Sequence, residues 1–129
     1  MIKKCLLIFI LLIVATTAQA EWIEVRPAKQ RQGETYYFDP MTAQKNRQFS
    51  KIWLLTSYDS KQKGGYHAIK SRYEFDCSSN KIRSITMLLY PDKIAAGAVI
   101  GAHHEESQDW FDFATDSIFQ HIFKVICDD

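Results

Sequence analysis

Residues 66–77 read Tyr-His-Ala-Ile-Lys-Ser-Arg-Tyr-Glu-Phe-Asp-Cys. From Ile69 to Cys77, apolar or small side chains occupy every second position, and charged side chains fill the positions between them. This period of two is typical of a strand with one buried and one solvent-exposed face. The stretch therefore predicts a central antiparallel strand that ends at Cys77 on its buried side.

The cysteine that follows Cys77 is Cys127, close to the C-terminus. Between residues 118 and 126, apolar side chains recur with the spacing i, i+1, i+4, i+5 and i+8, which places them on one face of a helix. Asp116 or Ser117 is the predicted N-cap of this helix. A bond between the two cysteines would tie the helix to the sheet, and two free buried thiols are the alternative.

The first twenty residues have the organisation of a secretory signal peptide. Lys3 and Lys4 precede an apolar run from Cys5 to Ala15, and Ala18 and Ala20 form the small-x-small site that signal peptidase cleaves. We expect cleavage after Ala20, which leaves residues 21–129 as one domain. The run is shorter than the roughly 20 residues that span a bilayer. An uncleaved anchor helix is the alternative, and no stable membrane span is expected after cleavage.

Charge and cysteine content limit the partners and the cellular compartment that are expected for the exported domain. The whole chain has 16 basic and 15 acidic residues, and removal of Lys3 and Lys4 leaves 14 against 15, a net charge of −1. A chain without a basic field is not expected to bind nucleic acid. Two cysteines remain, an even number that suits a compartment in which disulfides persist.

Several further strands are predicted from alternation and β-favouring composition. The Asp39–Pro40 pair is expected to end the second of them, and residues 41–50 are read as a turn leading into the next strand. Residues 51–58 are apolar on both faces, which predicts a central strand covered on both sides. The strands are expected at residues 22–27, 35–40, 51–58, 82–90 and 98–102. The side chains expected between sheet and helix are Trp53, Tyr73, Phe75, Ile118, Ile122 and Phe123.

Residues 59–65 are predicted to form an exposed, cationic hairpin loop whose Gly-Gly pair can take positive φ. Lys61 and Lys63 lie in it, and Tyr58 and Tyr66 flank it. A cationic tip beside tyrosines can engage acidic or aromatic partners. These four residues are the candidate binding site, and a solvated loop tip without a ligand is the alternative.

No constellation in the chain predicts catalysis. His103 and His104 open the one cluster with metal-ligand residue types, but adjacent histidines on a strand point to opposite faces. We read residues 103–109 as a polar loop without a metal. The serines lack a glycine-framed nucleophile elbow, and neither a phosphate loop nor a zinc spacing is present. The sequence predicts a non-enzymatic protein without a cofactor.

Taken together, these features resemble the surface-adhesin protein E domain of Gram-negative bacteria, and the likeness covers nearly all of the exported domain. One departure is residues 113–117, where the family has a Pro-Gly-Ser helix entry. The residues that carry the resemblance are Trp22, Tyr37, Asp39, Lys51, Trp53, Tyr58, Asp59, Tyr66, Ser71, Phe75, Asp76, Cys77, Tyr90, Trp110, Ser117 and Cys127.

The resemblance implies an α+β, mainly β fold: a curved antiparallel sheet of about six strands with a C-terminal helix on its concave face, tied by the Cys77–Cys127 disulfide. It also implies binding of host matrix or serum proteins such as vitronectin and laminin, with plasminogen and haem implied for the founding adhesin. The protein is then expected in the periplasm, at the cell surface or secreted. A periplasmic small-ligand-binding or envelope-maintenance protein with the same fold is the alternative.

Overall fold

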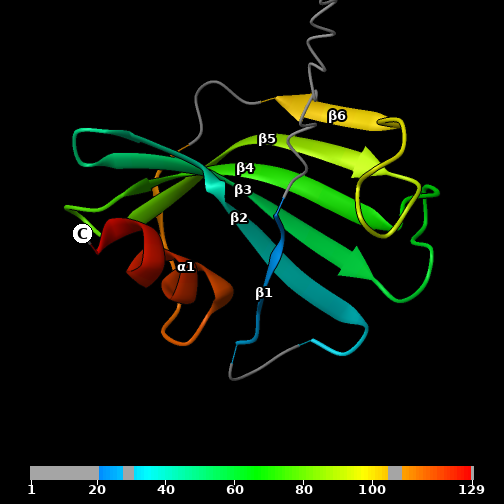
Figure 1. Cartoon of the computed structure of the whole chain (residues 1–129), viewed down its shortest axis with the longest axis horizontal. Helices are drawn as coiled ribbons and strands as arrows, with labels where there is room; N and C mark the ends of the chain where they lie inside the picture. Colours follow the sequence, from blue (N-terminus) through cyan, green and yellow to red (C-terminus); the bar gives the residue numbers. More distant parts are fainter. Residues whose placement is uncertain (1–20, 28–30, 105–108, 129) are drawn as a thin grey trace, which may run out of the picture.

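An open, curved antiparallel sheet carries one C-terminal helix in the part of the chain that this computed structural model describes, residues 21–27, 31–104 and 109–128 (Figure 1). Strands β1 to β6 follow one another in chain order across the sheet, and β7 pairs with β5 beside that series. The predicted signal peptide, residues 1–20, lies outside the described residues. The elements are β1 (Ile23–Val25), β2 (Glu34–Asn46), β3 (Phe49–Tyr58), β4 (Ala68–Asp76), β5 (Lys81–Tyr90), β6 (Gly101–His104), β7 (Phe111–Asp112) and α1 (Ile118–Cys127).

Strand β4 is central, as its alternation predicts. It pairs with β3 from Ala68 to Asp76 and with β5 over the same residues, with one irregularity between Arg72 and Tyr73. Phe75 is fully buried on one face, while Lys70 is half-buried on the other. Because every residue of β4 has a neighbour on each side, the strand fixes which side chains of β3 and β5 share a face.

Strand β2 is longer than the sequence indicates. The Asp39–Pro40 pair was expected to end it, and this prediction is wrong, because β2 continues to Asn46. Its pairing with β3 is irregular between Asp39 and Gln44. Pro40 falls within that irregularity, where the ladder does not need the N–H that proline lacks. The turn expected over residues 41–50 is confined to Arg47 and Gln48.

Side chains replace part of the missing ladder at this irregularity. The carboxylate of Asp39 accepts a hydrogen bond from the backbone N–H of Met41 at 3.0 Å. The hydroxyl of Thr42 donates to the Asp39 carbonyl at 2.6 Å and accepts from the backbone N–H of Trp53 at 3.2 Å. These bonds satisfy groups that a regular strand would pair with its neighbour.

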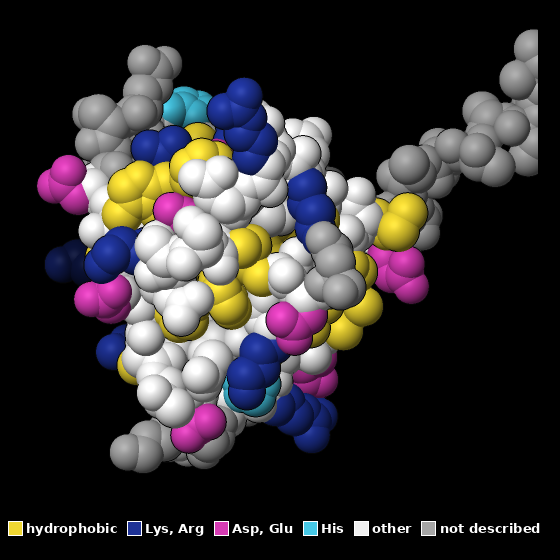
Figure 2. All heavy atoms as spheres, turned by 90° about the vertical axis from the view of Figure 1, so that its left-hand side faces the viewer, with side chains coloured by type: hydrophobic (Ala, Val, Ile, Leu, Met, Phe, Trp, Pro, Cys, Tyr) yellow, Lys and Arg dark blue, Asp and Glu magenta, His cyan; other side chains and the backbone are white. Residues whose placement is uncertain are grey.

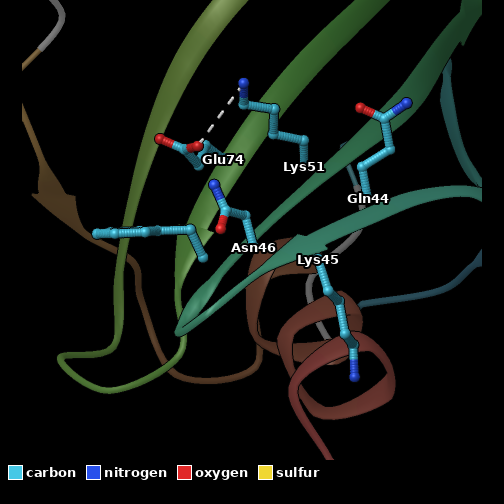
Figure 3. Close-up of a pocket in the computed structure, with 6 residues that line it drawn as sticks. Gln44, Lys45, Asn46, Lys51 and Glu74 are labelled. Carbon is cyan, nitrogen blue, oxygen red and sulfur yellow. Dashed lines mark ion pairs between the residues drawn. The ribbon is translucent and has the colours of Figure 1, made fainter.

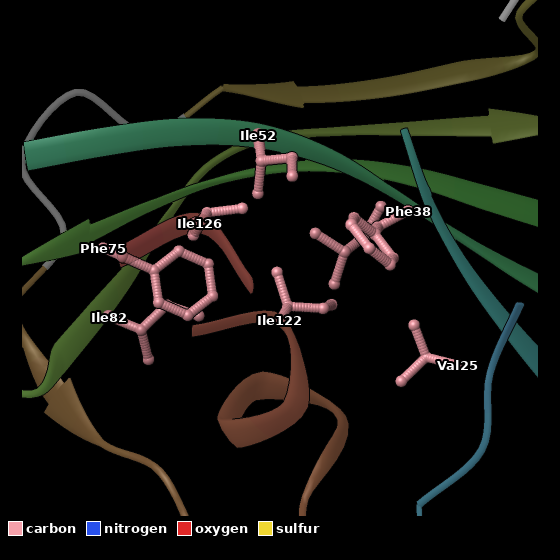
Figure 4. Packing of buried hydrophobic residues seen from close by; sticks show 8 residues of the cluster. Val25, Phe38, Ile52, Phe75, Ile82, Ile122 and Ile126 are labelled. Atoms are coloured by element: carbon pink, nitrogen blue, oxygen red, sulfur yellow. The ribbon is translucent and has the colours of Figure 1, made fainter. Parts of the chain in front are cut away.

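The main core lies between the sheet and α1. Ile122 and Ile126 project from the helix onto the sheet, and Phe75 lies against Phe113 and Phe123, with ring centroids 6.2 Å apart in both pairs. Figure 4 shows the buried side chains of this core converging from β1, β2, β3, β4, β5 and α1. The buried members are Val25, Phe38, Ile52, Leu54, Phe75, Ile82, Ile122 and Ile126, and the partly buried ones include Tyr73, Ile118 and Phe123. The predicted core is therefore correct except at one position.

Trp53 is the exception, because it lies on the face of the sheet opposite to the helix. It pairs with Arg72, and its neighbours in β3, Ile52 and Leu54, are the residues that reach the main core. The alternation of side chains along a strand then sends Trp53 to the other side. A second, smaller core on that side is formed by Leu55, Ala68 and Tyr90, with Trp22, Tyr37, Leu88 and Ala95 packed against it.

The segment after β5 differs from its predicted form. A strand was expected at residues 98–102 and a polar loop from residue 103, but β6 spans Gly101–His104 and includes both histidines. His103 pairs with Met87 and His104 with Thr86, so the histidines project from opposite faces. Among the described residues no group of three His, Cys, Asp or Glu side chains could hold a metal ion. Residues 105–108 lie outside the described residues.

Helix α1 begins and ends as the sequence indicates. Ser117 is the N-cap, and its side chain accepts a hydrogen bond from the backbone N–H of Gln120 at 3.3 Å. At the other end, Cys127 is bonded to Cys77, which directly follows β4, and the Cα atoms of the two lie 5.5 Å apart. The disulfide therefore ties the last turn of the helix to the end of the central strand.

Candidate functional site

The loop between β3 and β4 is an ordered turn at one end of the sheet. The backbone N–H of Gln62 donates to the carbonyl of Tyr66 at 2.8 Å, and that of Gly65 donates to the carbonyl of Gln62 at 2.9 Å. Gly64 and Gly65 take positive φ values of 104° and 85°. Lys61 and Lys63 are exposed on this loop.

The structure brings the two candidate tyrosines together at the base of the loop. The rings of Tyr58 and Tyr66 meet edge to face with centroids 5.8 Å apart. Burial, reinforced by the negative charge of Glu34, raises the pKa of Tyr58. Tyr36 donates a short hydrogen bond to Glu34, and burial together with this bond raises the pKa of Tyr36 to about 12. Tyr58 and Tyr36 therefore stay protonated at physiological pH.

A second candidate surface lies on the face of the sheet opposite to α1, and we call it the tryptophan–cation face. It consists of Trp22, Lys51, Trp53, Lys70, Arg72, Glu74, Arg83 and Trp110. All three tryptophans of the chain belong to it. Each of them has a basic group over its ring, so the face combines positive charge with aromatic surface.

The cations at the centre of this face are held by the tryptophan rings. The Nζ atom of Lys70 lies 4.9 Å from the ring centroid of Trp53 and 5.8 Å from that of Trp22. The guanidinium of Arg72 lies 5.9 Å from the Trp53 ring, and its Nη2 donates to the Oε1 of Gln44 at 2.7 Å. Cation–π contacts of this kind are worth about 0.5–2 kcal/mol. Within the described residues no carboxylate lies within ion-pair distance of Lys70 or Arg72.

The next position along β4 on the same face is Glu74, whose carboxylate pairs with two basic side chains of this surface. Its Oε1 lies 2.6 Å from the Nη2 of Arg83, and its Oε2 lies 4.0 Å from the Nζ of Lys51. Arg83 also covers the ring of Trp110 at 4.5 Å, and Phe49 stacks on that ring at 5.6 Å. The Glu74 carboxylate thus pairs with two of the four basic side chains of this surface. The surface therefore retains more basic than acidic groups.

A shallow pocket of about 230 Å³ opens beside Glu74, at the end of the sheet where β2 turns into β3. Figure 3 shows Gln44, Asn46, Lys51 and Glu74 on one side of the sheet, with the Lys51–Glu74 ion pair dashed, while Lys45 points toward α1. The pocket is lined by Gln44, Lys45, Asn46, Phe49, Lys51 and Glu74. It is open and polar, which suits surface contact more than enclosure of a small molecule.

Glu74→Gln is expected to lower the free energy of unfolding by about 1–3 kcal/mol, because Arg83 would lose its charged partner at a position where Glu74 is nearly buried. The exposed Glu24–Arg26 pair provides the matched control, and Glu24→Gln should change stability by about 0.5 kcal/mol or less. Urea unfolding of the two variants measures the difference. Equal stability of the two would show that the Glu74 ion pairs contribute nothing.

Sequence reasoning found the loop but missed the tryptophan–cation face. The charged positions of residues 70–76 were predicted to be the solvent-exposed side of the strand, but Glu74 is only 7% exposed, and Lys70 and Arg72 are half-buried. Nothing in the sequence placed Trp53 or Trp110 beside them. Elsewhere, charges are mixed: Figure 2 shows basic and acidic side chains interspersed over the end of the molecule that it presents.

Comparison with protein families gives one match over almost the whole described chain. A family model described as surface-adhesin protein E matches residues 22–128. Among curated proteins none matches this chain. No helix within the described residues is both long and apolar enough to cross a bilayer.

Solved structures provide a second comparison. Crystal form II of Haemophilus influenzae protein E superimposes with a TM-score of 0.59 at 12% sequence identity, covering 81% of this chain and 95% of that one. Protein E from non-typeable Haemophilus influenzae gives a TM-score of 0.58, also at 12% identity, covering 84% of this chain and 85% of that one. At this identity the likeness establishes a common fold.

Proposed function

The chain belongs to the surface-adhesin protein E family, and from this premise we propose that it is an exported, non-enzymatic, adhesin-like protein that binds host matrix or serum proteins. Vitronectin and laminin are the partners to test first. The observation that carries the proposal is the ordered β3–β4 loop, on which Lys61 and Lys63 are exposed and which is flanked by the paired rings of Tyr58 and Tyr66.

The geometry of this loop supports a contact with a protein surface. Its backbone hydrogen bonds fix the turn, so little conformational entropy is lost when a partner binds. Lys61 and Lys63 can pair with acidic side chains, and the side chains of Tyr58 and Tyr66 can form hydrogen bonds or pack against apolar groups. Tyrosine is also among the residues most enriched at binding hot spots.

The test is binding of the exported protein to immobilised vitronectin and laminin. We expect saturable binding that weakens as salt rises, because exposed lysines act over a Debye length of about 8–10 Å at physiological ionic strength. The Lys61→Ala, Lys63→Ala variant should bind at least about fivefold more weakly, which corresponds to about 1 kcal/mol. A Lys45→Ala, Lys124→Ala variant removes the same charge far from the loop and should bind as the wild type does.

The outcomes of this experiment distinguish whether the protein binds host proteins from whether the β3–β4 loop is the binding site. No binding of the wild type to either protein would overturn the host-protein proposal. Equal binding by wild type and loop variant would keep host-protein binding and reject this loop as its site. Cell fractionation adds an independent arm, since a protein found only in the periplasm would favour a small-ligand-binding or envelope-maintenance role.

A further inference from the structure

We propose that the tryptophan–cation face binds a linear acidic polysaccharide, one that carries sulfate or carboxylate groups along its chain. This surface is separate from the β3–β4 loop and takes a different class of ligand.

The basic groups form a row on a rigid strand. Lys70 and Arg72 are two residues apart on one face of β4, which places their Cα atoms about 7 Å from each other. One step further along the same face, Lys51 and Arg83 flank Glu74 from the neighbouring strands. A polymer with anionic groups at regular intervals could therefore meet successive cations without bending sharply.

The row is richer in basic than in acidic side chains, although the expected mature domain carries a net charge of −1. Four basic side chains share this face with the carboxylate of Glu74, which is only 7% exposed, and the next acid on this face of β4, Asp76, accepts hydrogen bonds from Ser78. Asp39, on the same face, is 2% exposed, and its carboxylate accepts backbone N–H groups of Glu21 and Met41. Attraction of a polyanion would thus be local to this face and not a general property of the chain.

The cations are pre-positioned, which lowers the cost of binding. Lys70 is held between two tryptophan rings, and Arg72 is held by Trp53 and by Gln44. Long basic side chains normally lose rotamer freedom when they grip an anion. Here part of that loss has already occurred in the free protein, while Lys51 and Arg83 remain 40% and 32% exposed.

The covered rings argue against nucleic acid as the ligand. Proteins that bind single strands stack bases on open aromatic faces. On this surface Arg83 and Phe49 both lie against Trp110, and Lys70 and Arg72 lie over Trp53. The rings hold the basic side chains in place, and because these side chains cover them, little aromatic surface is open for a base to stack on. The same burial leaves no projecting tryptophan to insert between lipids.

The experiment follows tryptophan fluorescence of the exported protein during titration with heparin, a sulfated polymer, with polygalacturonate, a carboxylated one, and with neutral dextran. All three tryptophans lie on the proposed face, so a ligand bound there changes the signal directly. We expect a saturable change with one or both acidic polymers and none with dextran. The acidic polymer that binds tells sulfate from carboxylate recognition, and an absence of binding to both would overturn the proposal.

Charge-matched variants test the site. Lys70→Gln with Arg72→Gln should weaken binding at least tenfold, whereas Lys45→Gln with Lys124→Gln, on the helix side, should change it less than twofold. Lys70→Arg with Arg72→Lys keeps both charges and should retain binding within about threefold, which separates loss of charge from loss of structure. Equal weakening by the first two variants would overturn the assignment of the face. Tighter binding to oligothymidylate or to phosphatidylglycerol vesicles than to either acidic polymer would overturn the assignment of the ligand.

Discussion

Replacement of Cys77 and Cys127 together by alanine is expected to lower the free energy of unfolding by about 2–5 kcal/mol. The bond joins residues 50 positions apart, so in the unfolded chain it closes a long loop and removes much of the conformational entropy of that state. In the folded protein it ties α1 to the end of β4. Since small domains are stable by only about 5–15 kcal/mol, the loss is a large share of the total. Urea unfolding of wild type and variant measures it.

Reduction provides the matched control for this prediction. Dithiothreitol should lower the stability of the wild type to that of the double variant and leave the variant unchanged. Mass spectrometry of non-reduced peptides should recover Cys77 and Cys127 in one linked species. Free thiols in most of the exported protein, or equal stability of wild type and double variant, would contradict the prediction.

Phe75→Ala is expected to cost about 3–5 kcal/mol of stability. The Phe75 ring is fully buried at the centre of the main core, in contact with Phe113 and Phe123. Its removal leaves a cavity between the central strand and α1 that neighbouring side chains, held by strands and disulfide, can fill only in part. Phe123→Ala, on the helix side of the same contact, should cost somewhat less because Phe123 is only half-buried.

Phe111 is the control for this substitution, since its ring is 40% exposed in the short strand β7. Phe111→Ala should cost about 1 kcal/mol or less. Thermal and urea unfolding of the three variants rank the losses. A Phe75→Ala protein as stable as Phe111→Ala would mean that α1 does not pack on the sheet as described.

The sequence predicted those elements whose periodicity is carried by many residues. Residues 69–77 alternate without interruption, and residues 118–126 repeat with a helical period, so both elements were found with their buried faces. Prediction was weaker where one residue was taken as a boundary. Pro40 was read as the end of a strand, but the irregular pairing around it supplies other hydrogen bonds, and β2 continues.

Short elements without a pattern of their own were also missed. His103 and His104 were read as loop because polar residues carry little strand preference, yet β5 pairs with them and extends the sheet. Phe111 and Asp112 form β7 for the same reason: pairing with Lys81 and Ile82 stabilises a strand of two residues that no local signal predicts. In each case backbone hydrogen bonds to a neighbour outweigh local propensity.

By itself the sequence predicted the central strands, the C-terminal helix, Cys127 as the possible partner of Cys77 and the exposed loop with Lys61 and Lys63, because each depends on local periodicity or on a small number of possible partners. The tertiary structure decided the tryptophan–cation face. β3 is apolar on both sides, so periodicity could not say which side Trp53 takes, and only the register with β4 places it against Arg72 and beside Lys70. A shift of one residue would send every one of these side chains to the opposite face.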